Sequence, residues 1–180
     1  MNKLVVNCGG MFSGKTSALL QQGERYLRKK VGKVIYIKPE NDGRYSENEI
    51  VTHNGISVEA TVMPTYGLSY TVGDYDIILI DEVQFFEEGV IEDIKSLLRK
   101  GKTVHVAGLD MDYKGEPFEI TTYLMGIADE VNKFRAVCEE CGNDATFSAR
   151  IIESNERIDV GGAESYSPRC RACFNKIRKG

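Results

Sequence analysis

Four residues near the N-terminus have the spacing of a phosphate-binding loop. Gly9, Gly14, Lys15 and Thr16 match the pattern of a glycine, four residues, and then Gly-Lys-Ser/Thr. The glycines let backbone amides curl around phosphate oxygens, the lysine adds a positive charge, and the threonine hydroxyl can ligate Mg²⁺. A short apolar run precedes the loop and a helix-like run follows it, as phosphate binding requires. A glycine-rich turn with an incidental lysine is the alternative.

Two acidic residues end another apolar run. The stretch "IILIDEVQFF" places Asp81 and Glu82 where a neighbouring strand should end. Asp81 would hold Mg²⁺ through water, and Glu82 could take a proton from an attacking hydroxyl of either water or a substrate. A structural role, capping the loop after the strand, is the alternative for both. The pair and the loop together predict a site for a nucleoside triphosphate with Mg²⁺, and they leave hydrolysis and transfer open.

Two Cys-x-x-Cys pairs lie in the last quarter of the chain. Cys138 and Cys141 form one, and Cys170 and Cys173 form the other, with a gap longer than the roughly 15 to 20 residues of ordinary zinc ribbons. Four thiolates predict a closed, structural, tetrahedral Zn²⁺ site. Free thiols or a redox pair are the alternatives. Cys8 lies in the first apolar run and is predicted to be a core thiol.

Apolar runs alternate with helix-like segments up to about residue 137. This rhythm predicts an α/β fold with a mostly parallel sheet flanked by helices, which together with the phosphate loop indicates a RecA-like architecture. After that point the pattern changes to short strand-like pieces at 145–152 and 156–160, which indicates a small second module. The runs that predict strands are 3–7, 33–39, 75–81 and 102–110, and those that predict helices are 15–30 and 90–98.

Composition limits the classes of partner. The net charge of −4 disfavours a nucleic-acid partner, because such proteins neutralise phosphates with an excess of Lys and Arg. No apolar run approaches the roughly 18 residues of a membrane span, and the N-terminal run is too short for a signal peptide. We therefore expect a cytoplasmic protein with no nucleic-acid or membrane partner.

Seven stretches, in order, resemble the zinc-containing, tetrameric (type II) thymidine kinases. The resemblance implies transfer of the γ-phosphate of ATP to the 5′-hydroxyl of thymidine, a homotetramer, and dTTP as a feedback inhibitor. It also implies an ATP-binding domain at 1–137 and, at 138–180, a zinc-binding domain with a nucleoside-binding lasso loop. The stretches are "GGMFSGKT", "YIKPENDGRY", "IDEVQFF", "GLDMDYKGEPF", "CEEC", "GGAESY" and "CRAC".

The resemblance also implies roles for individual residues. Glu82 matches the general base, and Thr16 and Asp81 match the Mg²⁺ residues. The implied zinc ligands are the four paired cysteines. The implied ATP-binding residues are Gly9, Gly10, Met11, Phe12, Ser13, Gly14, Lys15, Thr16, Asp81 and Gln84, and the implied thymidine-binding residues are Met11, Leu109, Tyr113, Gly161 and Tyr166.

Some residues depart from the family pattern or carry no assigned role. Gly10 stands where the family commonly has proline, which should loosen the entry to the loop, and the turn around His53 differs from the family's tetrapeptide. Asp42 and Arg44 match a family motif but receive no role here. Arg25 and Arg150 are possible phosphate partners or solvated surface residues.

Two other functions fit part of the sequence. One is a different phosphate-loop ATPase, in which Glu82 activates water and the zinc module binds nucleic acid. The other is a non-catalytic zinc-ribbon binding module, which would leave the acidic pair beside a phosphate loop unexplained.

Overall fold

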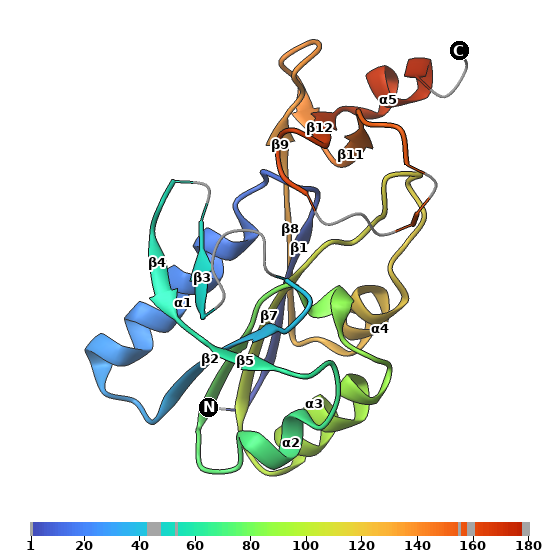
Figure 1. Ribbon diagram of the computed structural model, residues 1–180. Helices are drawn as coiled ribbons and strands as arrows, with labels where there is room; N and C mark the ends of the chain where they lie inside the picture. Colours follow the sequence, from blue (N-terminus) through green and yellow to red (C-terminus); the bar gives the residue numbers. More distant parts are fainter. Residues whose placement is uncertain (1, 43–47, 53, 155, 158–160, 178–180) are drawn as a thin grey trace.

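A six-stranded sheet forms the centre of the molecule (Figure 1). The computed structural model describes residues 2–42, 48–52, 54–154, 156–157 and 161–177. The strand order is β5-β2-β6-β7-β1-β8, and every pairing within this sheet is parallel. The strands are β1 (Leu4–Gly9), β2 (Val34–Pro39), β5 (Thr61–Met63), β6 (Ile77–Ile80), β7 (Thr103–Gly108) and β8 (Glu130–Phe134).

Helices cover both faces of the sheet, because its central strands are buried on both sides. On β6, Ile78 and Ile80 pack in one core with α2, α3 and α4, whereas Ile77 and Leu79 pack in the other core with α1 (Figure 1). Within the described ranges, every helix is too short or too polar to serve as a membrane span. The helices are α1 (Lys15–Lys29), α2 (Leu68–Thr71), α3 (Gly89–Arg99) and α4 (Glu119–Ile127).

The predicted α/β architecture is confirmed, and the structure adds elements that the sequence did not indicate. The strands β5 and β8, the helix α4 and a separate hairpin were not predicted. Each is short or only partly buried, so its hydrophobic periodicity is weak. The hairpin pairs β3 (Glu49–Val51) with β4 (Ser57–Glu59), and a single 3₁₀ turn, η1 (Val83–Phe85), follows the acidic pair.

The small C-terminal module consists of two antiparallel pairs of strands and one helix. The predicted strand at 145–152 is instead divided between two strands and ends at Arg150. Of the predicted strand at 156–160, residues 156 and 157 are not in a strand and 158–160 lie outside the described residues. A hairpin crosses the proposed domain boundary after residue 137, and that boundary stays a prediction. The elements are β9 (Ala136–Val137), β10 (Asp144–Ala145), β11 (Phe147–Arg150), β12 (Tyr166–Arg169) and α5 (Arg171–Ile177).

A buried histidine lies beneath α1. His105 on β7 is 2% exposed, and its Nε2 lies 3.0 Å from the hydroxyl of Tyr26. Its Nδ1 has no hydrogen-bond partner among the described residues. Burial, together with the nearby charge of Lys3, lowers the pKa of His105 to about 4, although Glu130 acts in the opposite direction. The folded protein therefore keeps this imidazole neutral.

We expect stability to fall as the pH drops from about 6.5 toward 4, because the unfolded chain binds a proton at His105 before the folded protein does. The pKa difference corresponds to roughly 2 to 3 kcal/mol at the acid end of this window. Urea unfolding at pH 7 and pH 4.5 would measure it. The variant His105→Leu should lose less stability over this interval than the wild type, and equal losses would contradict the assignment.

Candidate active site and metal centre

The phosphate loop joins the end of β1 to the start of α1, as predicted. Two of its glycines have backbone conformations that other residues rarely adopt. Gly14 has φ of 90°, and Gly9 has φ of 143°, with a Cβ at Gly9 falling 2.5 Å from the carbonyl oxygen of Phe134. The loop therefore depends on glycine at both positions.

The loop is closed by hydrogen bonds to one carbonyl group. Lys15 Nζ and Ser13 Oγ each donate to the carbonyl oxygen of Gly10, both at 2.8 Å. Lys15 is buried, so its ammonium group lies within the loop. The N-terminus of α1 starts at the same place and contributes its positive dipole end. The loop is thus electrostatically suited to an anion.

The two residues predicted to hold Mg²⁺ lie against each other. The Thr16 hydroxyl is 3.2 and 3.1 Å from the two carboxylate oxygens of Asp81 and donates to them. Burial and the neighbouring Glu82 raise the pKa of Asp81 to about 7, and the charge of Lys15 opposes this rise. A hydroxyl and a carboxylate beside a phosphate loop are hard oxygen ligands of the kind that Mg²⁺ prefers.

Glu82 is buried and has a left-handed backbone with φ of 50°. Gln84 lies behind it and does not line the cavity described below. Gln84 Nε2 donates to Glu82 Oε2 at 2.5 Å, and Gln84 Oε1 accepts the backbone N–H of Leu109 at 3.0 Å. Gln84, which the resemblance implied to bind ATP, therefore connects the carboxylate of Glu82 to the end of β7.

A cavity at the carboxyl edge of the sheet brings most of the predicted ATP-site residues together. It also contains three charged residues with no role assigned from the sequence, Lys38, Asp42 and Glu49. Lys38 is 3% exposed and donates from Nζ to the carbonyl oxygen of Glu49 at 3.2 Å, and Asp42 is buried beside it. The predicted residues that line the cavity are Met11, Phe12, Ser13, Gly14, Lys15, Thr16, Asp81, Glu82 and Leu109, and those not predicted are Ser17, Lys38, Asp42, Glu49, Ile50, Val51 and Thr52.

Lys38 lies at the end of β2. Because the carboxyl ends of parallel strands meet at one edge of the sheet, this position could have indicated that Lys38 belongs to the site. Asp42 had a second signal, its match to a family motif. Arg44 and His53 lie outside the described residues.

The small module contacts the phosphate loop directly. Ser148 Oγ on β11 accepts the backbone N–H of Met11 at 2.8 Å, and Phe12 packs against the cysteine cluster. A Cβ at Gly10 would lie 3.1 Å from Ser148 Oγ and 3.3 Å from the carbonyl oxygen of Thr146. The module therefore comes close to the loop entry at Gly10.

Three of the predicted nucleoside residues lie apart from the cavity. The ring centroid of Tyr113 is 3.8 Å from the guanidinium of Arg150, and the Tyr166 hydroxyl accepts a hydrogen bond from the same guanidinium at 3.0 Å. Gly161 lies close to Ser165, whose Oγ would be 2.4 Å from a Cβ at position 161. Arg150 thus joins the two tyrosines, whereas Met11 and Leu109 line the cavity with the phosphate loop.

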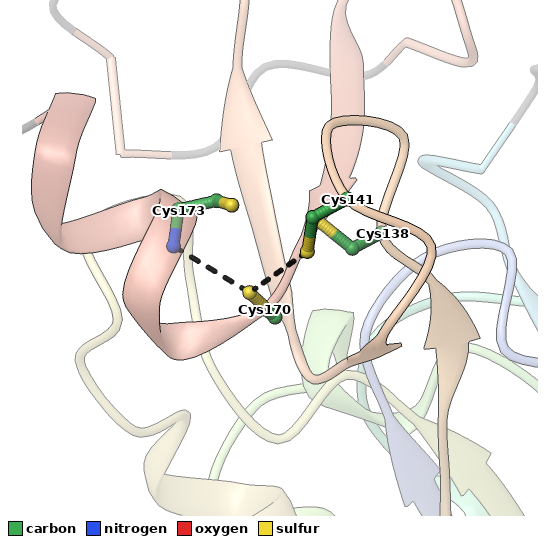
Figure 2. Close-up of side chains that lie close together, drawn as sticks. All are labelled: Cys138, Cys141, Cys170 and Cys173. Atoms are coloured by element: carbon green, nitrogen blue, oxygen red, sulfur yellow. Dashed lines mark hydrogen bonds between the residues drawn. The ribbon is translucent and has the colours of Figure 1, made fainter.

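The four paired cysteines converge from the β9–β10 turn and the start of α5 (Figure 2). Their sulfur atoms all lie within 4.8 Å of one another, and the Sγ atoms of Cys141 and Cys170 are 3.6 Å apart. Zinc bonds of about 2.3 Å in a tetrahedron would place the sulfurs about 3.8 Å apart. This donor set fits a zinc ion. Cys8 is remote from the cluster, and burial raises the pKa of its thiol, as expected for a core cysteine.

The parallel sheet, the phosphate loop and the acidic residues at its edge define a phosphate-loop nucleotide-binding protein. The sequence profile named "Thymidine kinase" matches residues 2–174. The chain therefore belongs to the thymidine kinase family.

Two relatives support this assignment over nearly the whole chain. A thymidine kinase of Bacteroides thetaiotaomicron is 38% identical over 179 residues, covering 98% of this chain and 88% of that protein. One of Bacteroides fragilis is 38% identical over 177 residues, covering 97% and 87%. Among solved structures, the flagellar accessory protein FlaH from Methanocaldococcus jannaschii aligns over 93% of this chain and 89% of its own, with a TM-score of 0.48 and 14% identity.

We expect Cys141→Ser to lose the metal, because a hydroxyl is a poor substitute for one of four thiolates. Elemental analysis of purified wild-type protein should give about one zinc per chain. The variant should give much less and should unfold at a lower temperature, since metal binding and folding of the small module are coupled. Cys8→Ala removes a thiol outside the cluster and should leave the zinc content unchanged. Wild-type zinc content in Cys141→Ser would contradict the assignment.

Proposed function

We propose that the protein transfers the γ-phosphate of ATP to the 5′-hydroxyl of thymidine, giving thymidine monophosphate and ADP. Membership of the thymidine kinase family and the names of its 38% identical relatives support this reaction. The observation that carries it is the position of Glu82. Its carboxylate lines the same cavity as the phosphate loop and lies next to Asp81. A base in that place can activate a hydroxyl for attack on a bound phosphate.

Each residue of the site has a separate role in phosphoryl transfer. Lys15, the loop amides and the N-terminus of α1 hold the phosphates of the donor. Thr16 and Asp81 would hold Mg²⁺, which supplies charge neutralisation when bound. Glu82 accepts the proton of the 5′-hydroxyl as the new O–P bond forms and the bond to the β-phosphate oxygen breaks. ADP leaves in line with the attacking oxygen.

Gln84 supports the base from behind. Its amide N–H donates to Glu82, which fixes the orientation of the carboxylate. Its carbonyl oxygen accepts from Leu109, a proposed nucleoside contact. We therefore assign Gln84 to positioning the base, in place of direct ATP binding.

The nucleoside is proposed to bind between the cavity and the small module. Met11 and Leu109 provide an apolar surface beside the phosphate loop. Tyr113, Gly161 and Tyr166 provide the opposite side, where backbone groups can read the thymine edge. Enclosure from both sides would exclude water, which would otherwise compete as the phosphate acceptor.

Other expectations also rest on the family. They are a homotetramer, feedback inhibition by dTTP, a cytoplasmic location and zinc as the structural metal. The competing reading, a phosphate-loop ATPase that binds nucleic acid, is not favoured by the family match or by the net charge of −4.

The reaction is tested by supplying ATP with thymidine, deoxyuridine, deoxycytidine or deoxyguanosine in turn. We expect strong formation of thymidine monophosphate and little ADP without a nucleoside, because transfer requires an acceptor hydroxyl in a closed site. ADP release that does not depend on nucleoside would identify an ATPase and overturn the proposal.

We expect Glu82→Gln to lower kcat by roughly 100-fold or more, because glutamine keeps the size of the side chain but cannot accept the proton. The KM for ATP should change little. Steady-state kinetics with thymidine would measure both. Glu87→Gln makes the same change at an exposed position outside the cavity and should behave as the wild type. Wild-type kcat in Glu82→Gln would remove Glu82 from the role of base.

A further inference from the structure

Arg150, at the end of β11, connects two segments that are distant in the sequence. Its guanidinium lies 3.8 Å from the ring centroid of Tyr113, in the loop that follows β7. One of its terminal nitrogens donates to the hydroxyl of Tyr166, at the start of β12, at 3.0 Å. One side chain therefore stacks on the first tyrosine and hydrogen-bonds to the second.

The same guanidinium also fixes the backbone that follows β11. It donates to the carbonyl oxygens of Ser154 and Glu156 at 3.2 and 2.5 Å. Its Nε is buried and has no hydrogen-bond partner among the described residues. A buried N–H without a partner costs free energy, which the contacts of the two terminal nitrogens must offset.

A second arginine joins the loop after β7 to the segment after β11. Arg157 Nε donates to the buried carboxylate of Asp112 at 3.0 Å, and another of its nitrogens donates to the carbonyl oxygen of Pro117 at 3.1 Å. The other carboxylate oxygen of Asp112 accepts the N–H groups of Lys114 and Glu116, which shapes the loop itself. In Figure 1 the yellow loop after β7 runs beside the orange segment after β11. The loop after β7 and the segment after β11 are thus held together by Arg150 and by Arg157.

These contacts decide between the two roles that the sequence left open for Arg150. Its described partners are the two tyrosines and backbone carbonyl oxygens, and it is not among the residues that line the cavity with the phosphate loop. Arg150 is half-buried and held by these partners, away from the cavity that contains the phosphate loop.

We propose that Arg150 is a positioning residue for the nucleoside: it holds Tyr113 and Tyr166 together so that they form one wall of the thymidine site. This inference rests on the proposed function, in which both tyrosines contact the nucleoside. Arginine suits the task because a planar guanidinium can stack on a ring and donate hydrogen bonds in its own plane at the same time. Lysine has a compact ammonium group and cannot do both.

The role has a kinetic signature that separates it from a merely structural one. Loss of Arg150 should release the wall of the nucleoside site while leaving the phosphate loop, Asp81 and Glu82 unchanged. Binding of thymidine should then weaken, and binding of ATP should not. General destabilisation of the small module would instead affect both substrates, because Ser148 and Phe12 connect that module to the phosphate loop.

The experiment compares wild type, Arg150→Gln, Arg150→Lys and a control in steady-state kinetics, with zinc content measured for each protein. We expect both substitutions at Arg150 to raise the KM for thymidine on the order of 10-fold to 100-fold, the scale of effect that misplacing binding groups produces. The KM for ATP and the zinc content should stay at wild-type values. The control is Arg135→Gln, which removes the same charge from an exposed pair with Asp144 near the same module; it should leave both KM values unchanged.

A double-mutant cycle tests the contact itself. Tyr166→Phe removes only the hydroxyl that accepts from Arg150, so its effect on the KM for thymidine should be smaller in the Arg150→Gln background than in the wild type. Additive effects, an unchanged KM for thymidine in Arg150→Gln, full rescue by lysine, or a parallel rise in the KM for ATP with loss of zinc would each overturn the proposal. Wild-type protein that does not phosphorylate thymidine would instead overturn the proposed function, and the nucleoside role of Arg150 with it.

Discussion

The position of every candidate catalytic residue depends on one constraint, the common direction of the strands in the central sheet. Because all six strands are parallel, their carboxyl ends meet at one edge. The phosphate loop follows β1, Asp81 and Glu82 follow β6, and Leu109 follows β7, which lies between those two strands. Reversal of any of these strands would carry its residues to the opposite edge. The sheet order therefore determines which segments can act on the same substrate.

The site gathers charged side chains that are largely buried. Lys15 and Lys38 lie in one cavity with three buried carboxylates, those of Asp42, Asp81 and Glu82. Buried charges need partners, and burial, together with the neighbouring carboxylate of Glu82, raises the pKa of Asp81. A triphosphate with Mg²⁺ would bring both a further anion for the lysines and a cation for the carboxylates. The arrangement is thus better balanced with the proposed donor than without it.

The sequence predicted the parts of the site that are encoded locally. The loop from Gly9 to Thr16 and the acidic pair after β6 each occupy a few consecutive residues, and their spacing carries their chemistry. The cysteine pairs were predicted for the same reason. The short strand β8 and the hairpin of β3 and β4 were not, because partial burial leaves little periodicity to detect.

The contacts between distant segments could not be predicted from spacing. Ser148 accepts a hydrogen bond from Met11, more than a hundred residues away in the sequence. Gln84 joins Glu82 to Leu109, and Arg150 contacts two tyrosines. Each depends on the sheet order and on the packing of the small module, which are properties of the folded chain. The family resemblance implied roles for Met11, Gln84 and the two tyrosines, but it indicated neither Ser148 and Arg150 nor the pairings.

The apolar core of the small module is too small to stabilise its fold alone. Its buried clusters are a group around the cysteines and a second group of Phe147, Ala149 and Phe174. These are completed by Phe12 and Met111, which lie in the loops after β1 and β7. Small modules of this kind usually require a metal or another covalent or coordinative constraint. A metal at the cysteines would therefore stabilise both surfaces that the module presents, the one that supports the phosphate loop and the one that carries Arg150 and Tyr166. A structural ion that takes no part in the chemistry could in this way influence donor and acceptor alike.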